Sequence, residues 1–90
     1  MIRIVAVCGA GVGSSMMLRL YTEQITKKHG IKAQVDASDI GSINPDEYEI
    51  VVTTTDFADR LSTSTHIIRM DNMTDKAYLE KELLKIVEES

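Results

Sequence analysis

The feature that most constrains the fold of this chain is an alternation of short apolar runs with longer helical patterns. The apolar runs have the length and composition of buried strands, and they cover residues 2–7, 31–37, 49–54 and 66–70. Helical patterns separate and follow them, at residues 14–29, 56–61 and 74–89. Strands that alternate with helices form a parallel sheet with right-handed crossovers. We therefore predict an α/β fold, a flavodoxin-like three-layer sandwich with a four-stranded parallel sheet of order 2-1-3-4.

Length and composition indicate one packed domain. The chain has 90 residues, too few to bury a second core, so residues 1–90 are predicted to form a single domain. A hydrophobic content of 43%, with 27% charged residues, is typical of globular proteins. The formal net charge is -4, and the lysines and arginines are scattered. Without a basic patch to neutralise phosphates, nucleic acid is not expected as a partner.

Cysteine usage and hydropathy point to a cytoplasmic protein. Cys8 is the single cysteine, so the chain can form neither an internal disulfide nor a cysteine-based metal cluster. No pair of His, Cys or acidic residues has metal-ligand spacing, and no metal is expected. The glycines and serines of residues 9–15 interrupt any resemblance to a signal peptide, and no apolar stretch has the length of a membrane span.

The glycine-rich segment after the first strand is the candidate site. In a doubly wound sheet, ligands bind beyond the carboxyl ends of the strands where the strand order reverses, here between strands one and three. Cys8 lies there, and the residues that follow it are Gly9, Ala10, Gly11, Val12, Gly13, Ser14 and Ser15. Glycines let successive backbone amides point at an anion, and the positive end of the next helix favours a thiolate. The segment therefore predicts an anion site with Cys8 as its nucleophile.

Two familiar phosphate-binding patterns do not fit this segment. The P-loop requires a lysine beside its second glycine, and no lysine occurs between Arg3 and Lys27. The dinucleotide pattern requires a third glycine where this chain has Ser14, although Asp36 lies near the end of the second predicted strand, where a ribose-binding acid would be. The chain is also too short for both halves of a dinucleotide-binding fold.

A third comparison is with the low-molecular-weight tyrosine phosphatases. Their cysteine also follows the first strand, and their loop reads C-x-x-x-x-x-R. In this chain Ser14 stands at the position of that arginine, so no guanidinium clamps the oxygens of a transferring phosphoryl group. The absence of that clamp disfavours hydrolysis. A site that forms a phosphocysteine but hydrolyses it slowly is suited to passing the phosphoryl group on.

The stretch VCGAGVGSSMM, residues 7–17, resembles the EIIB components of the sugar phosphotransferase system (PTS), in particular their ascorbate and galactitol-like branch. It carries their cysteine at the end of strand one and their C-x-x-G-x-G-S-S loop. The resemblance implies a phosphotransferase component in which Cys8 accepts a phosphoryl group from a phosphohistidine of EIIA. Cys8 then donates the group to a sugar bound by the membrane permease EIIC, while residues 9–15 hold the phosphate. Transfer between side chains requires no nucleotide, so no cofactor is expected.

Other polar residues are weighed by their place in the predicted sheet. Thr54 and Thr55 end the third strand beside the loop and are secondary candidates for phosphoryl contact. Asp56 stands at the start of the helix predicted over residues 56–61, and it is interpreted as the N-cap of that helix rather than as a catalytic acid. His66 begins the fourth strand at the opposite edge of the sheet, and His29 suits the negative end of the first helix. Neither histidine is a candidate for phosphorylation.

The first helix carries Met16 and Leu20 opposite its core-facing side, so both are predicted to be partly exposed. Methionine repacks easily against different surfaces, which suits a surface that docks two partners. Equally, a neighbouring loop could simply cover the two side chains. Met70 and Met73 are candidates for the same rim.

Two rival functions stay open at this point. The first is a phosphatase-type hydrolase, which would turn over an aryl phosphate without any acceptor; Ser14 in place of arginine argues against it. The second is a non-catalytic, anion-binding regulatory module with an unreactive Cys8 thiol, and the glycine-rich surroundings argue against that. Ser14 and Ser15 are also open to interpretation as plain helix caps, which is compatible with phosphate binding.

Overall fold

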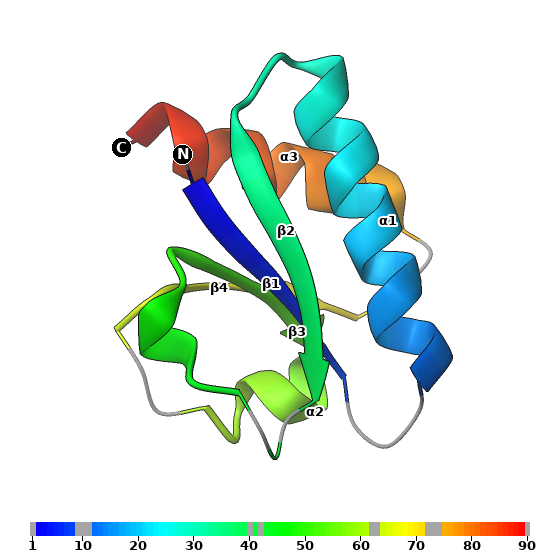
Figure 1. Ribbon diagram of the computed structural model, residues 1–90, viewed down its shortest axis with the longest axis vertical. Coiled ribbons are helices and arrows are strands. Elements are labelled where there is room, and N and C mark those ends of the chain that lie inside the picture. The colour runs from blue at the N-terminus through cyan, green and yellow to red at the C-terminus, as the bar shows by residue number, and fades with distance from the viewer. Residues whose placement is uncertain are drawn as a thin grey trace.

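A computed structural model describes residues 2–8, 12–39, 41, 43–61, 64–71 and 75–89. Its strands are β1 (Ile2–Cys8), β2 (Ala33–Asp39), β3 (Ile50–Thr54) and β4 (His66–Met70). Its helices are α1 (Val12–Lys28), α2 (Thr55–Ala58) and α3 (Lys76–Glu89), with a 3-10 helix at Pro45–Glu47. The strands form one parallel sheet of order β2-β1-β3-β4 (Figure 1). The predicted fold and strand order are confirmed.

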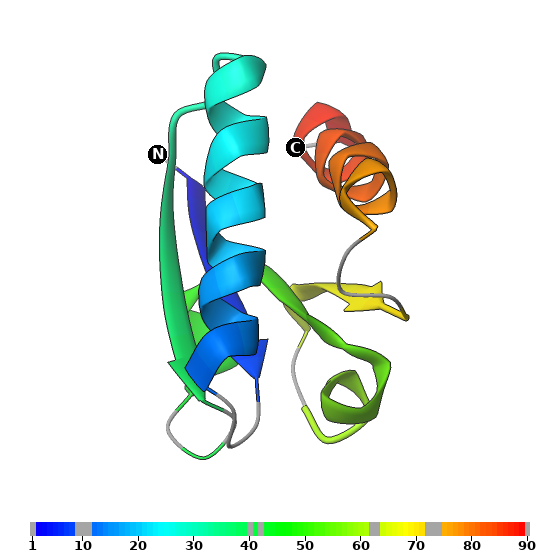
Figure 2. The ribbon, with the colours of Figure 1, turned by 90° about the vertical axis from the view of Figure 1, so that its right-hand side faces the viewer.

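Two helices cover one face of the sheet. Figure 2 shows α1 beside β2 and β1, and α3 beyond it toward β4. The main core lies between these helices and the sheet, where Ile4, Val52, Leu18 and Leu83 are buried. The other face buries a smaller cluster that includes Val5, Val7 and Val51. Because β1 and β3 are buried on both faces, each contains a run of consecutive apolar residues, 4–7 in β1 and 50–52 in β3.

The boundary of β2 differs from the prediction of residues 31–37. The strand spans Ala33–Asp39, because the amide of Ile31 closes the end of α1 by donating to the Thr26 carbonyl at 2.8 Å. Gly30 makes this closure possible with a φ of +66°, a conformation in which glycine carries no Cβ penalty. Asp36 therefore lies in the middle of β2 rather than near its end.

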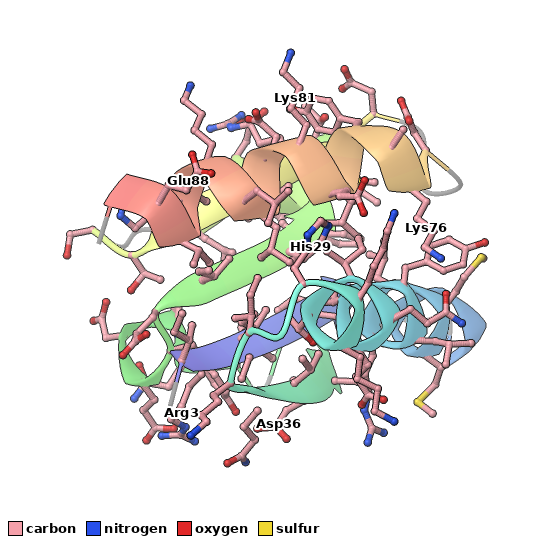
Figure 3. All side chains as sticks on the ribbon, turned by 90° about the horizontal axis from the view of Figure 1, so that it is seen from above. Arg3, His29, Asp36, Lys76, Lys81 and Glu88 are labelled. Atoms are coloured by element: carbon pink, nitrogen blue, oxygen red, sulfur yellow. The ribbon has the colours of Figure 1, made fainter. Side chains whose placement is uncertain are left out.

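The end of α1 is also tied to α3 by charge. The Glu80 carboxylate lies 3.1 Å from His29 Nε2 and 3.3 Å from Lys28 Nζ, and Figure 3 shows His29 at the end of α1, facing α3. Hydrogen bonds from His29 and then Lys28 lower the pKa of Glu80 below its ordinary value of 4.5. Lys27 and Lys28, in the last turn of α1, also suit its negative end, as expected.

Replacing Glu80 by a neutral residue is expected to change how the free energy of unfolding depends on pH in the acid range. A lowered native pKa stabilises the fold fully above the ordinary pKa of 4.5 and loses that contribution as the pH falls through the native value. Glu80→Gln should therefore show a shallower loss of unfolding free energy below about pH 4.5 than the native chain. Urea denaturation at a series of pH values measures this. Glu88→Gln on the same helix is the matched control and should keep the native slope; an equal slope for Glu80→Gln would contradict the assignment.

Candidate functional site

Cys8 lies where the predicted site requires it. It is the last residue of β1, an internal strand between β2 and β3, and in the sheet register it stands opposite Asp39. The chain leaves β1 toward β2 on one side and returns to β3 on the other, so the strand order reverses beside Cys8. Figure 1 shows β1 ending and α1 beginning at the same, lower edge of the fold. This edge is where ligands bind in open α/β sheets.

The helix that follows begins earlier than the predicted residue 14. It starts at Val12, four positions after Cys8, and runs for 17 residues. Ser14 and Ser15 therefore lie inside its first turns, and their interpretation as helix caps is wrong. Gly13 also belongs to the helix. The first amides of a helix have no acceptor within it and carry its positive dipole end, so this start brings anion-seeking groups close to Cys8 in sequence.

The structure describes only part of the predicted phosphate loop. Gly9, Ala10 and Gly11 lie outside the described residues, and Val12 to Ser15 are described as helical backbone. The role of residues 9–15 as phosphate ligands stays a prediction.

A buried threonine joins the two strand ends that form the site. Thr53 is fully buried and donates its hydroxyl to the Val7 carbonyl at 2.8 Å, directly before Cys8. Val7 and Thr53 are also partners in the β1–β3 register. Sequence reasoning missed this residue, because it singled out only the two threonines that follow. The bond fixes the position of the carboxyl end of β1 relative to β3.

Removing this hydroxyl is expected to destabilise the site end of the sheet. Thr53→Val keeps the volume and loses the buried bond, which should lower the free energy of unfolding by about 1 kcal/mol in urea denaturation. The same change at Thr55, whose hydroxyl bond lies at the surface, should cost less than about 0.5 kcal/mol because water replaces the partner. Equal stability of native and Thr53→Val chains would show that the bond contributes nothing.

The two secondary candidates differ in their surroundings. Thr55 is the first residue of α2 and donates its hydroxyl to Asp71 Oδ1 at 2.6 Å, just beyond β4. A hydroxyl has one proton, so Thr55 has none left for a phosphoryl oxygen in this arrangement. Thr54, at the end of β3, is the N-cap of α2, and its side chain makes no capping bond within the described part of the chain. Thr54 is therefore the better candidate donor.

The interpretation of Asp56 as a helix cap is wrong. The helix α2 covers Thr55–Ala58 rather than residues 56–61, and its N-cap is Thr54. The backbone of Thr54 is still extended, with φ -78° and ψ 160°, so the strand passes directly into the helix and Asp56 falls inside the first turn.

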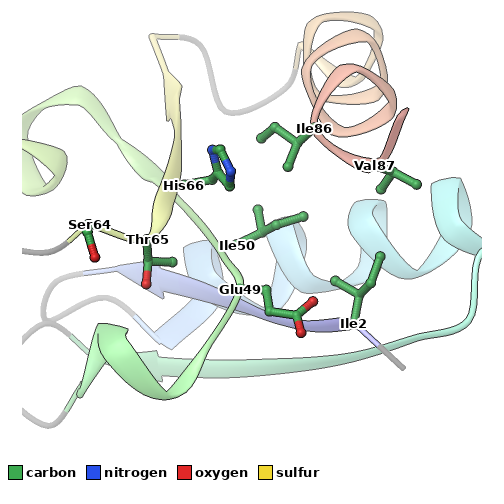
Figure 4. A pocket seen from close by; sticks show the side chains of 8 residues that line it. All are labelled: Ile2, Glu49, Ile50, Ser64, Thr65, His66, Ile86 and Val87. Carbon is green, nitrogen blue, oxygen red and sulfur yellow. The ribbon is translucent and has the colours of Figure 1, made fainter. Parts of the chain in front are cut away.

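Both histidines lie away from the Cys8 edge, as expected. His66 begins β4 at the opposite edge, where it lines a cavity of about 300 Å³ with Ile50, Ile86 and Val87 among others (Figure 4). His29 contacts Glu80. The cavity lies at the amino ends of β1, β3 and β4, so it is not continuous with the predicted phosphate site.

The exposed face of α1 agrees with the prediction. Met16 and Leu20 are 50% and 52% exposed. The expectation that Met70 joins their rim is wrong, because Met70 is 1% exposed and packs in the core under α3. Met73 lies outside the described residues. Within the part of the chain that the structure describes, none of the helices has the length and hydropathy of a membrane span.

Comparisons with known proteins agree with this arrangement. A family model described as "PTS system, Lactose/Cellobiose specific IIB subunit" matches residues 3–85. The "Ascorbate-specific PTS system EIIB component" of Shigella dysenteriae is 27% identical over 92 residues, which cover 98% of this chain and 91% of that protein. The component of the same name from Mycoplasma pneumoniae is 26% identical over 90 residues, covering 96% and 95%.

A solved structure supports the fold. The lactose-specific IIB domain of the Streptococcus pneumoniae PTS superposes with a TM-score of 0.61 and covers 98% of this chain and 95% of that one, at 16% identity. That likeness establishes the architecture, and the family match establishes descent. The resemblance predicted from residues 7–17 is confirmed: the chain belongs to the family of PTS IIB subunits, components of sugar phosphotransferase systems.

Proposed function

We propose that this chain carries a phosphoryl group on Cys8, between a phosphohistidine of EIIA and a sugar bound by EIIC. The observation that carries the proposal is the place of Cys8 at the end of the internal strand β1, four residues before the start of a 17-residue helix. The positive end of a helix stabilises the thiolate form of a nearby cysteine and attracts anions. Membership of the PTS IIB family supports the phosphoryl-transfer role.

The transfer consists of two displacements at phosphorus. In the first, the Cys8 thiolate attacks the phosphoryl group of the donor, forming an S–P bond as the N–P bond breaks and the imidazole leaves. In the second, a sugar hydroxyl attacks, forming an O–P bond as the S–P bond breaks and the thiolate is restored; the hydroxyl proton passes to a base of the acceptor site. Amides and hydroxyls of residues 9–15 would stabilise the equatorial oxygens in both steps.

Surrounding residues support this role. Thr54 is proposed as an additional donor to the phosphoryl oxygens. The 2.6 Å bond from Thr55 to Asp71 ties the first residue of α2 to the residue that follows β4. Ser14 stands at the position of the phosphatase arginine, so no guanidinium stabilises the transition state for attack by water on the phosphocysteine. The phosphocysteine therefore persists until an acceptor arrives. The carrier requires no cofactor.

The partners and the place of action follow from the same role. EIIA would supply the phosphoryl group in the cytoplasm, and EIIC would present the sugar at the inner face of the membrane. The curated relatives carry the description "Ascorbate-specific", so ascorbate is the first acceptor to test.

Intact-mass spectrometry tests the carrier role. The chain is incubated with phosphoenolpyruvate, the general phosphotransfer proteins and an EIIA. The expected result is the addition of one phosphoryl group. An aryl phosphate offered without any acceptor should not be turned over; steady turnover would favour the hydrolase instead. No addition, with a donor chain shown to phosphorylate another EIIB, would contradict the proposal.

A further inference from the structure

One buried threonine side chain differs from the others in the described part of the chain. Thr22, Thr26 and Thr53 are buried, with at most 4% of each exposed. The hydroxyls of Thr22 and Thr26 donate to carbonyls one turn earlier in their own helix, at 2.7 Å and 3.0 Å. Such local bonds are common for threonines in helices and indicate no tertiary role. The hydroxyl of Thr53 instead reaches from one strand to a neighbouring strand.

The partner of Thr53 is the peptide group that leads into the proposed nucleophile. The Thr53 hydroxyl donates to the Val7 carbonyl at 2.8 Å, and the β1–β3 register ends with this same pair of residues. The carbonyl of Val7 and the amide of Cys8 belong to one planar peptide group. A bond that holds this carbonyl therefore also fixes the direction of the Cys8 amide and the position of the Cys8 Cα.

Burial makes this hydrogen bond a strong constraint. Val7 and Thr53 are both 0% exposed, and Val7 belongs to the smaller apolar cluster on its side of the sheet. In such surroundings a hydrogen bond is stronger than at the surface, and a carbonyl that loses its partner is costly. On the opposite side of β1, Cys8 pairs in register with Asp39 of β2. The backbone at Cys8 is thus held between two strands, with the Thr53 hydroxyl holding it on the β3 side.

We propose that Thr53 is a positioning residue for phosphoryl transfer, whose buried hydroxyl holds the peptide group between Val7 and Cys8 in the orientation that the reaction requires. This inference rests on the carrier function proposed above. Displacement at phosphorus requires the entering and leaving atoms to lie roughly in line. A misplacement of the nucleophile by about 1 Å can lower the rate by about 100-fold. Thr53 acts through the backbone that carries Cys8, because its one hydroxyl proton is used in the bond to Val7.

The test separates the rate of the transfer step from binding of the donor. Thr53→Val keeps the size and branching of the side chain and removes the hydroxyl. Transfer from phosphorylated EIIA is followed in a single turnover at increasing EIIA concentration, at a temperature where circular dichroism shows each variant to be folded. The maximal rate should fall by about fivefold to tenfold. The half-saturating concentration should stay within about twofold of the native value, because the buried Thr53 side chain is not available to EIIA.

Transfer onward to the sugar gives a second measurement of the same effect. Both displacements at phosphorus use the sulfur of Cys8, in the first as the entering atom and in the second as the leaving atom. Delivery of the phosphoryl group from phosphorylated Thr53→Val to the sugar on EIIC should therefore slow by a similar factor.

Two matched variants separate positioning from loss of stability. Thr53→Ser keeps the hydroxyl and loses a buried methyl group, so it should be less stable than the native chain and still transfer within about threefold of the native rate. Thr22→Val removes a hydroxyl that is equally buried and bonded at 2.7 Å, but within α1, and should keep the maximal rate within about twofold. If the rate merely followed stability, both variants would slow together with Thr53→Val.

The outcomes distinguish this inference from the carrier function. A native maximal rate in Thr53→Val, or equal slowing in Thr22→Val, would overturn the inference and leave Cys8 as the carrier. If Thr53→Val raised only the half-saturating concentration, Thr53 would affect binding of EIIA, and the positioning role would be wrong. If the native chain accepts no phosphoryl group from an active donor, the carrier function fails and the inference fails with it. Should Thr53→Val not fold, Thr53→Ala, which also lacks the hydroxyl, replaces it with the same expectations.

Discussion

Replacing Cys8 by serine is expected to lower the rate of sugar phosphorylation by about 1,000-fold or more, because the covalent intermediate can no longer form. Serine is nearly isosteric with cysteine, but its hydroxyl is not ionised near neutral pH. The positive end of α1 can favour a thiolate far more readily than an alkoxide. The rate is measured as sugar phosphate formed from phosphoenolpyruvate with EIIA and with membrane vesicles that contain EIIC.

Competition supplies the control for this variant. Cys8→Ser exchanges only the sulfur for an oxygen and changes no residue of either core cluster, so the variant should still bind phosphorylated EIIA. Added in excess, it should slow phosphorylation of the native chain. A variant that fails to compete would point to misfolding rather than to loss of the nucleophile. A competing variant that still supports sugar phosphorylation at the native rate would rule out Cys8 as the carrier.

Truncating Ile4 is expected to have the largest effect on stability. Ile4 is fully buried in β1, pairs in register with Val35 and Ile50, and packs in the core beneath the helices. Ile4→Ala should lower the free energy of unfolding by about 3 kcal/mol, through lost apolar burial and the cavity that remains. Against a typical total of about 5–15 kcal/mol, this is a large fraction. The melting temperature should fall by roughly 15 °C for a domain of this size.

A graded control checks the cause of that loss. Ile4→Val removes one methylene group and should cost about 1 kcal/mol, measured by the same urea and thermal unfolding. If Ile4→Ala cost no more than Ile4→Val, the surroundings of Ile4 would be loosely packed, contrary to its complete burial.

Much of the sheet could be predicted from sequence because its signals are local. Consecutive apolar residues mark β1 and β3, and Gly30, which follows Lys27, Lys28 and His29, marks the end of α1. The predicted starts of β2 and α2 are wrong because backbone hydrogen bonds and backbone conformation, rather than local composition, set where these elements begin. The amide of Ile31 is used to close α1, which delays β2 to Ala33, and the extended backbone of Thr54 lets α2 begin at once.

The candidate site was predictable only in part. The place of Cys8 follows from the sheet order, whereas the Thr53 to Val7 and Thr55 to Asp71 hydrogen bonds join residues far apart in sequence. Their partners depend on strand register, which no local pattern specifies. The error at Met70 had an available signal: the alternation of β4 places Met70 on the same face as the buried Ile68.

The most direct test of the proposed carrier role is to locate the phosphoryl group itself. The chain is phosphorylated by EIIA, digested at neutral pH and sequenced by tandem mass spectrometry, with Cys8→Ser treated in parallel. The carrier role predicts one phosphoryl group, on Cys8 of the native chain, and its disappearance when sugar and EIIC are added. A phosphoryl group on His29 or His66, or one that survives in Cys8→Ser, would contradict it.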